Sequence, residues 1–206
     1  MKKIYFLFLL QSLILNLPSS FGQAGTWTWI SGDSTINSPG VYGTQGVPNP
    51  SNVPPALYEP CEWTDLNGNF WMYGGLDENI GISVHNDLWE YDPVANMWTW
   101  MTGTKAANDT GNFGIQGVDS ASNRPPSLAW GTSSWVDLKG NLWMFGGCIN
   151  NSSSYVQSNL WKYDIAANEW TWVNGPGLII NMGIYGTQGV PDAANYPPGR
   201  CGCAAA

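Results

Sequence analysis

The chain has 206 residues, including 13 Trp, 25 Gly and 14 Pro, and only 11% of its residues are charged. Disordered segments are charge-rich and aromatic-poor, and coiled coils consist mostly of Ala, Glu, Lys, Leu and Arg, so the composition argues against both. The formal net charge of −8 disfavours nucleic acid and anionic membrane surfaces as partners, because both are themselves negative. Abundant Gly, Pro and Trp predict an all-β protein of many short strands and turns.

Residues 1–22 have the pattern of a secretory signal peptide. Lys2 and Lys3 form a positive start, an apolar run follows at 4–17, and small residues come next at Ser19, Ser20 and Gly22. The run is short for a spanning helix and has the flanks of a removable signal; the alternative is an N-terminal membrane anchor. We expect the mature chain, residues 23–206, to be secreted or at the cell surface without a membrane span. Loss of the two lysines changes its net charge from −8 to −10.

A repeat of 71 to 72 residues runs through the rest of the chain. Trp-Thr-Trp begins at Trp27, Trp98 and Trp170. A Gly pair and a Tyr/Phe-Gly-x-Gln-Gly-Val loop recur in the same phase. Internal repeats of this kind are typical of architectures built from similar units. We expect units at about 27–97, 98–169 and 170–206, with the last one truncated.

Four short strands are predicted in each complete unit. They fall at 62–64, 69–73, 87–91 and 97–101 in one unit, and at 134–136, 141–145, 159–163 and 169–173 in the next. The second strand of each unit is apolar on both faces, which predicts an interior strand, and we expect it to end at the Gly pair. The first two strands are joined by a turn ending in Gly68 or Gly140, as positive φ requires. A calcium loop at Asp65, Asn67 and Asn69 is the less favoured alternative.

Four antiparallel strands per repeat, with Gly pairs and phased aromatic residues, predict β-propeller blades. Gly pairs suit the crowded axis, and Trp rings suit the wider gaps between blades. The sequence resembles the kelch repeat family of the galactose oxidase/kelch superfamily, through its double Gly and its Tyr-Asp-(Pro)-x-x-Asn-x-Trp string. The resemblance covers residues 27–200, although kelch repeats are about 20 residues shorter. The markers that carry it are Gly74, Gly75, Tyr91, Trp98, Gly146, Gly147, Tyr163 and Trp170.

The predicted propeller is partial: two complete four-stranded blades flanked by orphan fourth strands at 27–30 and from Trp170. Closed propellers have about four to eight blades. The favoured explanation is a truncated fragment of a longer propeller. The alternative is a short chain that assembles with others. Open blade edges invite self-association.

The four cysteines, Cys61, Cys148, Cys201 and Cys203, allow three pairings in an exported protein. Cys61 and Cys148 occupy different phases of the repeat, and Cys201 and Cys203 are too close for an easy mutual bridge. The sequence leaves the pairing open.

No catalytic, cofactor-binding or metal-binding residue is assigned from the sequence, and no cofactor is expected. Resemblance to galactose oxidase implies copper held by two His and two Tyr, with one Tyr cross-linked to Cys. This chain has a single His, His85, which we expect in a solvated loop. The predicted function is non-enzymatic binding of a protein or glycan. The alternatives are part of a galactose-oxidase-like or glycan-processing enzyme whose catalytic residues lie outside this chain, and a nonfunctional remnant.

The long loops between units are the candidate binding elements, because loops on a rigid scaffold commonly carry binding. An aromatic ring near an amide suits sugars and peptide backbone. The alternative is a structural role at the blade junctions, which is favoured because scaffold features repeat in every unit. The candidate residues are Tyr42, Gln45, Phe113, Gln116, Tyr185 and Gln188.

Overall fold

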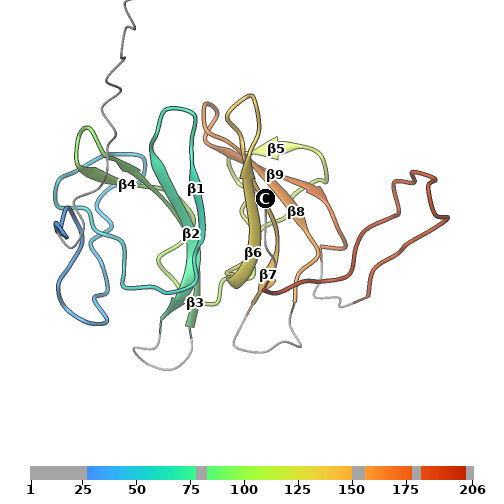
Figure 1. Ribbon diagram of the computed structural model, residues 1–206, viewed down its shortest axis with the longest axis horizontal. Coiled ribbons are helices and arrows are strands. Elements are labelled where there is room, and N and C mark those ends of the chain that lie inside the picture. Colours follow the sequence, from blue (N-terminus) through green and yellow to red (C-terminus); the bar gives the residue numbers. More distant parts are fainter. Residues whose placement is uncertain (1–26, 78–82, 150–155, 178–181, 203–206) are drawn as a thin grey trace, which may run out of the picture. The chain divides into compact units, whose positions relative to one another are not determined.

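The computed structural model describes residues 27–77, 83–149, 156–177 and 182–202. Its regular elements are strands in two antiparallel sheets (Figure 1), which confirms the all-β class. The described part contains no helix long and apolar enough to cross a membrane. The expected signal peptide and Cys203 lie outside the described residues.

Each sheet contains a meander of four consecutive strands, and the second sheet has one further strand, β5, beside β9. The first has the order β1-β2-β3-β4, with β1 at Cys61–Thr64, β2 at Phe70–Asp77, β3 at Ser83–Asp92 and β4 at Met97–Thr102. The second has the order β5-β9-β8-β7-β6. Its strands are β5 at Asp119–Ser120, β6 at Ala129–Val136, β7 at Leu142–Cys148, β8 at Leu160–Asp164 and β9 at Glu169–Asn174.

Neither segment that was predicted as an orphan strand is one in the structure. Residues 27–30 lie outside every strand, because an extended segment becomes a strand only when a neighbour pairs its backbone. Trp170 belongs to β9, where it pairs with Tyr163 as the fourth meander strand of the second sheet.

The turn between the first two strands of each meander is held by one Asp. The Asp65 carboxylate accepts hydrogen bonds from the Asn67 backbone N–H at 2.8 Å and from Trp71 Nε1 at 3.0 Å. Asp137 makes the equivalent bonds in the second sheet. Gly68 has a φ of 89°, which favours glycine. The hairpin-turn interpretation is therefore confirmed, and Asp65 is engaged in the turn.

The Tyr-Asp-x-x-x-Asn-x-Trp string forms the hairpin between the third and fourth strands of each meander. The Tyr91 hydroxyl donates to Asn96 Oδ1 at 2.7 Å, and Asn96 itself has a φ of 54°. The Tyr91 ring lies 4.9 Å from the Trp98 ring, between centroids. The second sheet repeats the bond and the ring contact at Tyr163.

The Gly pairs do not end their strands, as the sequence analysis expected; β2 continues beyond Gly74 and Gly75 to Asp77. The register of β2 against β3 shifts between Tyr73 and Gly75, and hydrogen-bonded pairing with β3 then continues from Gly75 to Asp77. A β-bulge of this kind re-aims a strand without terminating it. Gly146 and Gly147 likewise lie within β7.

The hydrophobic core lies between the two sheets. The Trp71 ring lies 5.7 Å from Tyr163, and Tyr73 lies 5.5 Å from Trp170, between centroids. Trp63 Nε1 donates to a backbone carbonyl of β7 at 2.8 Å. We call the packed side of the first sheet face A and the packed side of the second face B. Face A carries Cys61, Trp63, Trp71, Tyr73 and Leu88, and face B carries Leu142, Met144, Trp161, Tyr163 and Trp170.

The long loop that precedes each meander covers the outer edge of that meander. In the first, the Gly46 N–H donates to the Trp100 carbonyl at 2.8 Å, and Asn52 Nδ2 donates to the Trp98 carbonyl at 2.9 Å. In the second, the loop contributes β5, which pairs with β9. The extra length of these repeats therefore satisfies edge-strand groups that would otherwise be open to pairing.

Candidate binding groove

The aromatic residue that begins each long loop packs on the sheet that follows it. The Tyr42 ring lies 5.0 Å from Trp89 and 5.2 Å from Trp100, between centroids. Phe113 has the equivalent contacts in the second sheet, at 5.0 and 5.3 Å. These two candidate residues hold the loop against the outer strands.

The Gln residues of the first two loops bond to backbone at the ends of those strands. Gln45 Nε2 donates to the Gly103 carbonyl at 3.4 Å, and Gln116 Nε2 donates to the Val173 carbonyl at 3.3 Å. Both contacts support a structural role, although these Gln side chains are solvent-exposed. Binding of a ligand by these loops stays a prediction.

The third loop has the internal structure of the other two. Ile184 pairs with Tyr196, as Val41 and Asn112 pair within their own loops. Tyr185, however, is 72% exposed, whereas Tyr42 and Phe113 are half-buried. Gln188 is exposed beside it. The structure thus separates Tyr185 from Tyr42 and Phe113 by environment, whereas the Gln side chain of every loop is exposed.

A groove of about 510 Å³ opens on the side of the second sheet that faces away from the core. Trp135 stacks on Trp143 with ring centroids 5.8 Å apart and an interplanar angle of 10°. The groove also reaches the third loop. Its lining is Ser133, Trp135, Phe145, Ser158, Leu160, Asn174, Tyr196 and Pro197. These side chains give a mostly apolar site with few polar groups, as ligand sites commonly have.

Ser158 provides the buried polar group of the groove. It is 1% exposed, and its Oγ has no hydrogen-bond partner among the described residues. At the equivalent position of the first sheet, Asn86 Nδ2 donates to the Pro125 carbonyl at 3.3 Å. A buried polar atom without a partner is costly unless a ligand or water satisfies it.

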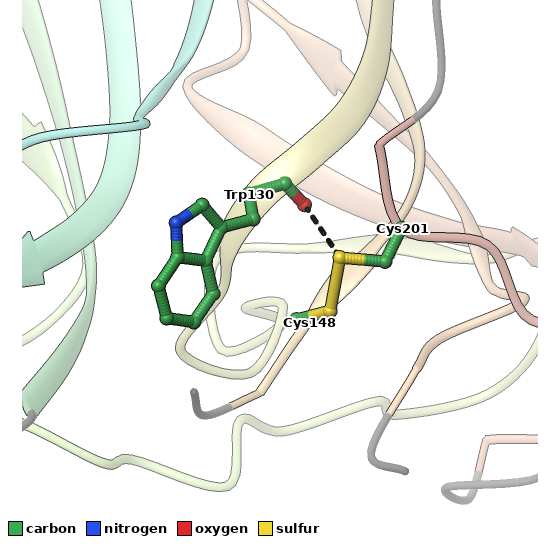
Figure 2. Close-up of a disulfide and its surroundings, with 3 residues drawn as sticks. All are labelled: Trp130, Cys148 and Cys201. Carbon is green, nitrogen blue, oxygen red and sulfur yellow. Dashed lines mark hydrogen bonds between the residues drawn. A yellow bond between two sulfur atoms is a disulfide. The ribbon is translucent and has the colours of Figure 1, made fainter. Parts of the chain in front are cut away.

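A disulfide holds the third loop beside the groove. Cys148 at the end of β7 is bonded to Cys201, with 5.8 Å between their Cα atoms, while Cys61 is a buried free thiol. Figure 2 shows the bridge next to Trp130, whose carbonyl oxygen lies 3.7 Å from the Cys201 sulfur. The pairing left open by the sequence is therefore Cys148 with Cys201.

His85 is not a solvated loop residue, so that expectation is wrong. It lies in β3 and is 6% exposed. Its Nε2 lies 2.6 Å from Asp77 Oδ2 across the β2–β3 ladder. Pairing with a carboxylate offsets the cost of burying the imidazole.

A buried carboxylate, Asp87, lies two residues further along β3. It accepts hydrogen bonds from the Tyr42 hydroxyl at 2.8 Å and from Trp89 Nε1 at 2.7 Å. Burial raises the pKa of Asp87, and these two hydrogen bonds partly offset that rise. The cluster fastens the first loop to its sheet and lies apart from the groove.

Sequence reasoning missed the groove. The signal that could have indicated it is the recurrence of a Trp and an aromatic residue at Trp63 and Tyr73, and again at Trp135 and Phe145. Residues that repeat at core positions mark the same face of both sheets. The pattern alone does not reveal which copy of that face is covered.

No family model matches the chain, and no curated protein matches its sequence. Among solved structures, the chain resembles one described as "Structure of YjhT", with 13% sequence identity and a TM-score of 0.29. The match covers 64% of this chain and 56% of that one, so the chain spans little more than half of that structure's length.

Proposed function

We propose that this chain is an exported, kelch-like β-propeller module that acts by binding a protein surface and not by catalysis. Two four-stranded antiparallel meanders in one repeat phase support the propeller part of the proposal. The resemblance of the Gly pairs and the Tyr-Asp-x-x-x-Asn-x-Trp string supports the kelch part. The pattern of residues 1–22 supports export.

The observation that carries the binding proposal is the groove on the second sheet. Trp135 is 40% exposed there, whereas Trp63, its equivalent in the first sheet, is 6% exposed in the core. A side chain suited to a core position but left open marks an interaction surface. The groove is lined by Trp135, Phe145 and Tyr196, and aromatic residues are enriched at protein interfaces.

A glycan is the second candidate ligand. The parallel rings of Trp135 and Trp143 offer a flat aromatic surface beside polar Ser133 and Asn174. Such a surface suits the apolar face of a sugar ring.

Two probes test the groove on the full chain. We expect the fluorescent apolar dye 1-anilinonaphthalene-8-sulfonate to bind the wild type and to bind Trp135→Arg much less, with Val94→Arg as the matched exposed control. An arrayed panel of oligosaccharides tests the glycan alternative with the same three proteins. Dye binding that is equal in wild type and Trp135→Arg would contradict a ligand site at the groove.

Export is tested separately. Expression of the full chain with residues 1–22 should release a product whose N-terminal sequence begins near residue 23. Retention of Lys2 and Lys3 in a membrane-bound product would instead support an anchor.

A further inference from the structure

The two sheets present their equivalent faces to different surroundings. Face A of the first sheet packs on face B of the second and forms the core. The repeat also places the positions of face A on the second sheet and those of face B on the first, and no other described sheet covers these two faces. The groove lies on face A of the second sheet, which we call the open face A. Its residues Ser133, Trp135, Phe145 and Leu160 correspond to Cys61, Trp63, Tyr73 and Leu88 of the core.

The third loop is attached to the open face A in the way that the second loop is attached to the first sheet. The Gly75 N–H donates to the Leu128 carbonyl at 2.9 Å, and the Leu128 N–H donates to the His85 carbonyl at 3.0 Å. One repeat later, the Gly147 N–H donates to the Arg200 carbonyl at 2.9 Å. The Arg200 N–H donates at 3.0 Å to the carbonyl of Gln157, which lies between β7 and β8. The second loop continues into the sheet that covers face A of the first sheet, so the third loop marks where another sheet fits.

The exposed ring of the third loop indicates the chemistry of that sheet. Tyr42 and Phe113 each pack on two Trp rings, one of which belongs to the Trp-Thr-Trp of the outer strand. Tyr185 begins the same loop motif but is 72% exposed. A strand carrying Trp-x-Trp would give Tyr185 the contacts that its two counterparts have.

We propose that the groove and residues 182–200 together form a docking site for one further four-stranded antiparallel sheet, which ends in a Trp-x-Trp strand and has no long loop of its own. This inference rests on the proposed function, because it names the partner of the same groove. The partner strand next to the groove would cover Trp135 and Phe145. The outer strand would pack on Tyr185.

A second copy of this chain does not fit the site in the same pose. Its residues 37–57 correspond to residues 108–128 by the repeat, so they would need the backbone positions beside Gly147. Arg200 of the first copy already occupies those positions, and the disulfide at Cys201 fixes it there. A partner sheet without a preceding loop avoids this overlap.

The test uses the full chain and a fluorescently labelled synthetic peptide with the sequence of residues 61–102, which carries the first sheet without its loop. We expect saturable binding in a fluorescence anisotropy titration. Trp135→Arg and Tyr185→Ala should each weaken it by about tenfold or more, as removal of a buried aromatic anchor does. Val94→Arg is the control variant and should bind as the wild type does. A peptide in which Ser replaces both Trp98 and Trp100 should bind much more weakly.

Leu160→Ser provides a second, milder groove variant, and near-ultraviolet circular dichroism checks that each variant is folded. Failure of the peptide to bind, or equal binding to wild type and to a folded groove variant, overturns the inference. Self-association of the wild-type chain that Trp135→Arg abolishes also overturns it, because a second copy is then the occupant. If the dye or an oligosaccharide still binds the groove while the peptide does not, the inference fails and the proposed function stands.

Discussion

The two units differ in their polar contacts where the long loop meets the third strand. In the first unit, the Tyr42 hydroxyl and Trp89 Nε1 both donate to Asp87 Oδ2. In the second unit the equivalent loop residue is Phe113, which has no hydroxyl, and the residue equivalent to Asp87 is the amide Asn159. Asn159 bonds to Gln157, and the indole N–H of Trp161 has no partner among the described residues. The second unit therefore replaces both partners of the Tyr42–Asp87 hydrogen bond, with Phe113 in place of Tyr and Asn159 in place of Asp.

We predict that Tyr42→Phe lowers the free energy of unfolding by about 1.5–3 kcal/mol, the usual contribution of a hydrogen bond to a charged group. In an Asp87→Asn background the same change should cost less, because Phe and Asn already coexist in the second unit. Urea unfolding of the two single variants and the double variant measures this coupling. Additive effects would show that Tyr42 and Asp87 act independently.

The raised pKa of Asp87 predicts an unusual dependence of stability on pH. Burial is the main cause of the rise above the ordinary 3.8. Between that value and the folded pKa, the folded chain binds more protons than the unfolded chain, so this group makes stability fall as pH rises. We expect Asp87→Asn to remove that fall, as measured by urea unfolding at several pH values from 3.5 to 7. An unchanged slope in the variant would assign the fall to another group.

At the scale of elements, sequence patterns were a good guide to strands and turns but not to the Gly pairs. All eight expected meander strands overlap observed ones, because alternating side chains and Asp-to-Gly turns are local features. The Gly pairs were assigned to a crowded propeller axis. In the structure Gly74 has a φ of 62° and the Leu128 backbone of the next loop lies against it, so its role depends on a contact distant in sequence.

We predict that Gly74→Ala destabilises the chain more than Gly68→Ala does. Both positions have positive φ, which costs an L-residue about 1–2 kcal/mol. A Cβ at Gly68 meets no atom within 4 Å, whereas at Gly74 it would lie 2.7 Å from the His85 carbonyl oxygen and also strike the Leu128 carbonyl. We therefore expect a loss of about 3 kcal/mol or more for Gly74→Ala. Equal urea midpoints for the two variants would contradict the close-approach argument.

At the scale of the whole molecule, the disulfide replaces an apolar contact of the first unit. By the repeat, Cys148 and Cys201 correspond to Leu76 and Ala129, which pack together in a small cluster. The bridge joins positions 53 residues apart. It therefore restrains residues 182–202 on the second sheet, where no further described sheet follows to hold them.

We predict that Cys148→Ser with Cys201→Ser lowers the free energy of unfolding by about 2–4 kcal/mol, as loss of a long-loop disulfide commonly does. It should also speed proteolysis within residues 182–202. The variant Cys148→Leu with Cys201→Ala recreates the Leu76–Ala129 pair and should recover part of the stability. Equal proteolysis of the wild type and the Ser variant would show that the bridge does not hold the third loop.

The candidate site could be predicted only in part. The loop residues Tyr42 and Phe113 were identified by their recurrence, but their environment shows them fastening loops to sheets. The groove residues were missed because Trp135 and Phe145 look like core residues in the sequence. Both have core counterparts in the first sheet, and only the position of the neighbouring sheet distinguishes the copies.

The all-β class, the two meanders and their turns could be predicted from the amino-acid sequence, because they follow from local periodicity and from residues that suit positive φ. The tertiary structure decided which faces are covered, that Cys148 pairs with Cys201, and that His85 is buried beside Asp77. Trp63 and Trp135 show the reason most plainly. They hold the same place in the repeat, yet one is 6% and the other 40% exposed, because burial depends on which distant segment packs against a side chain.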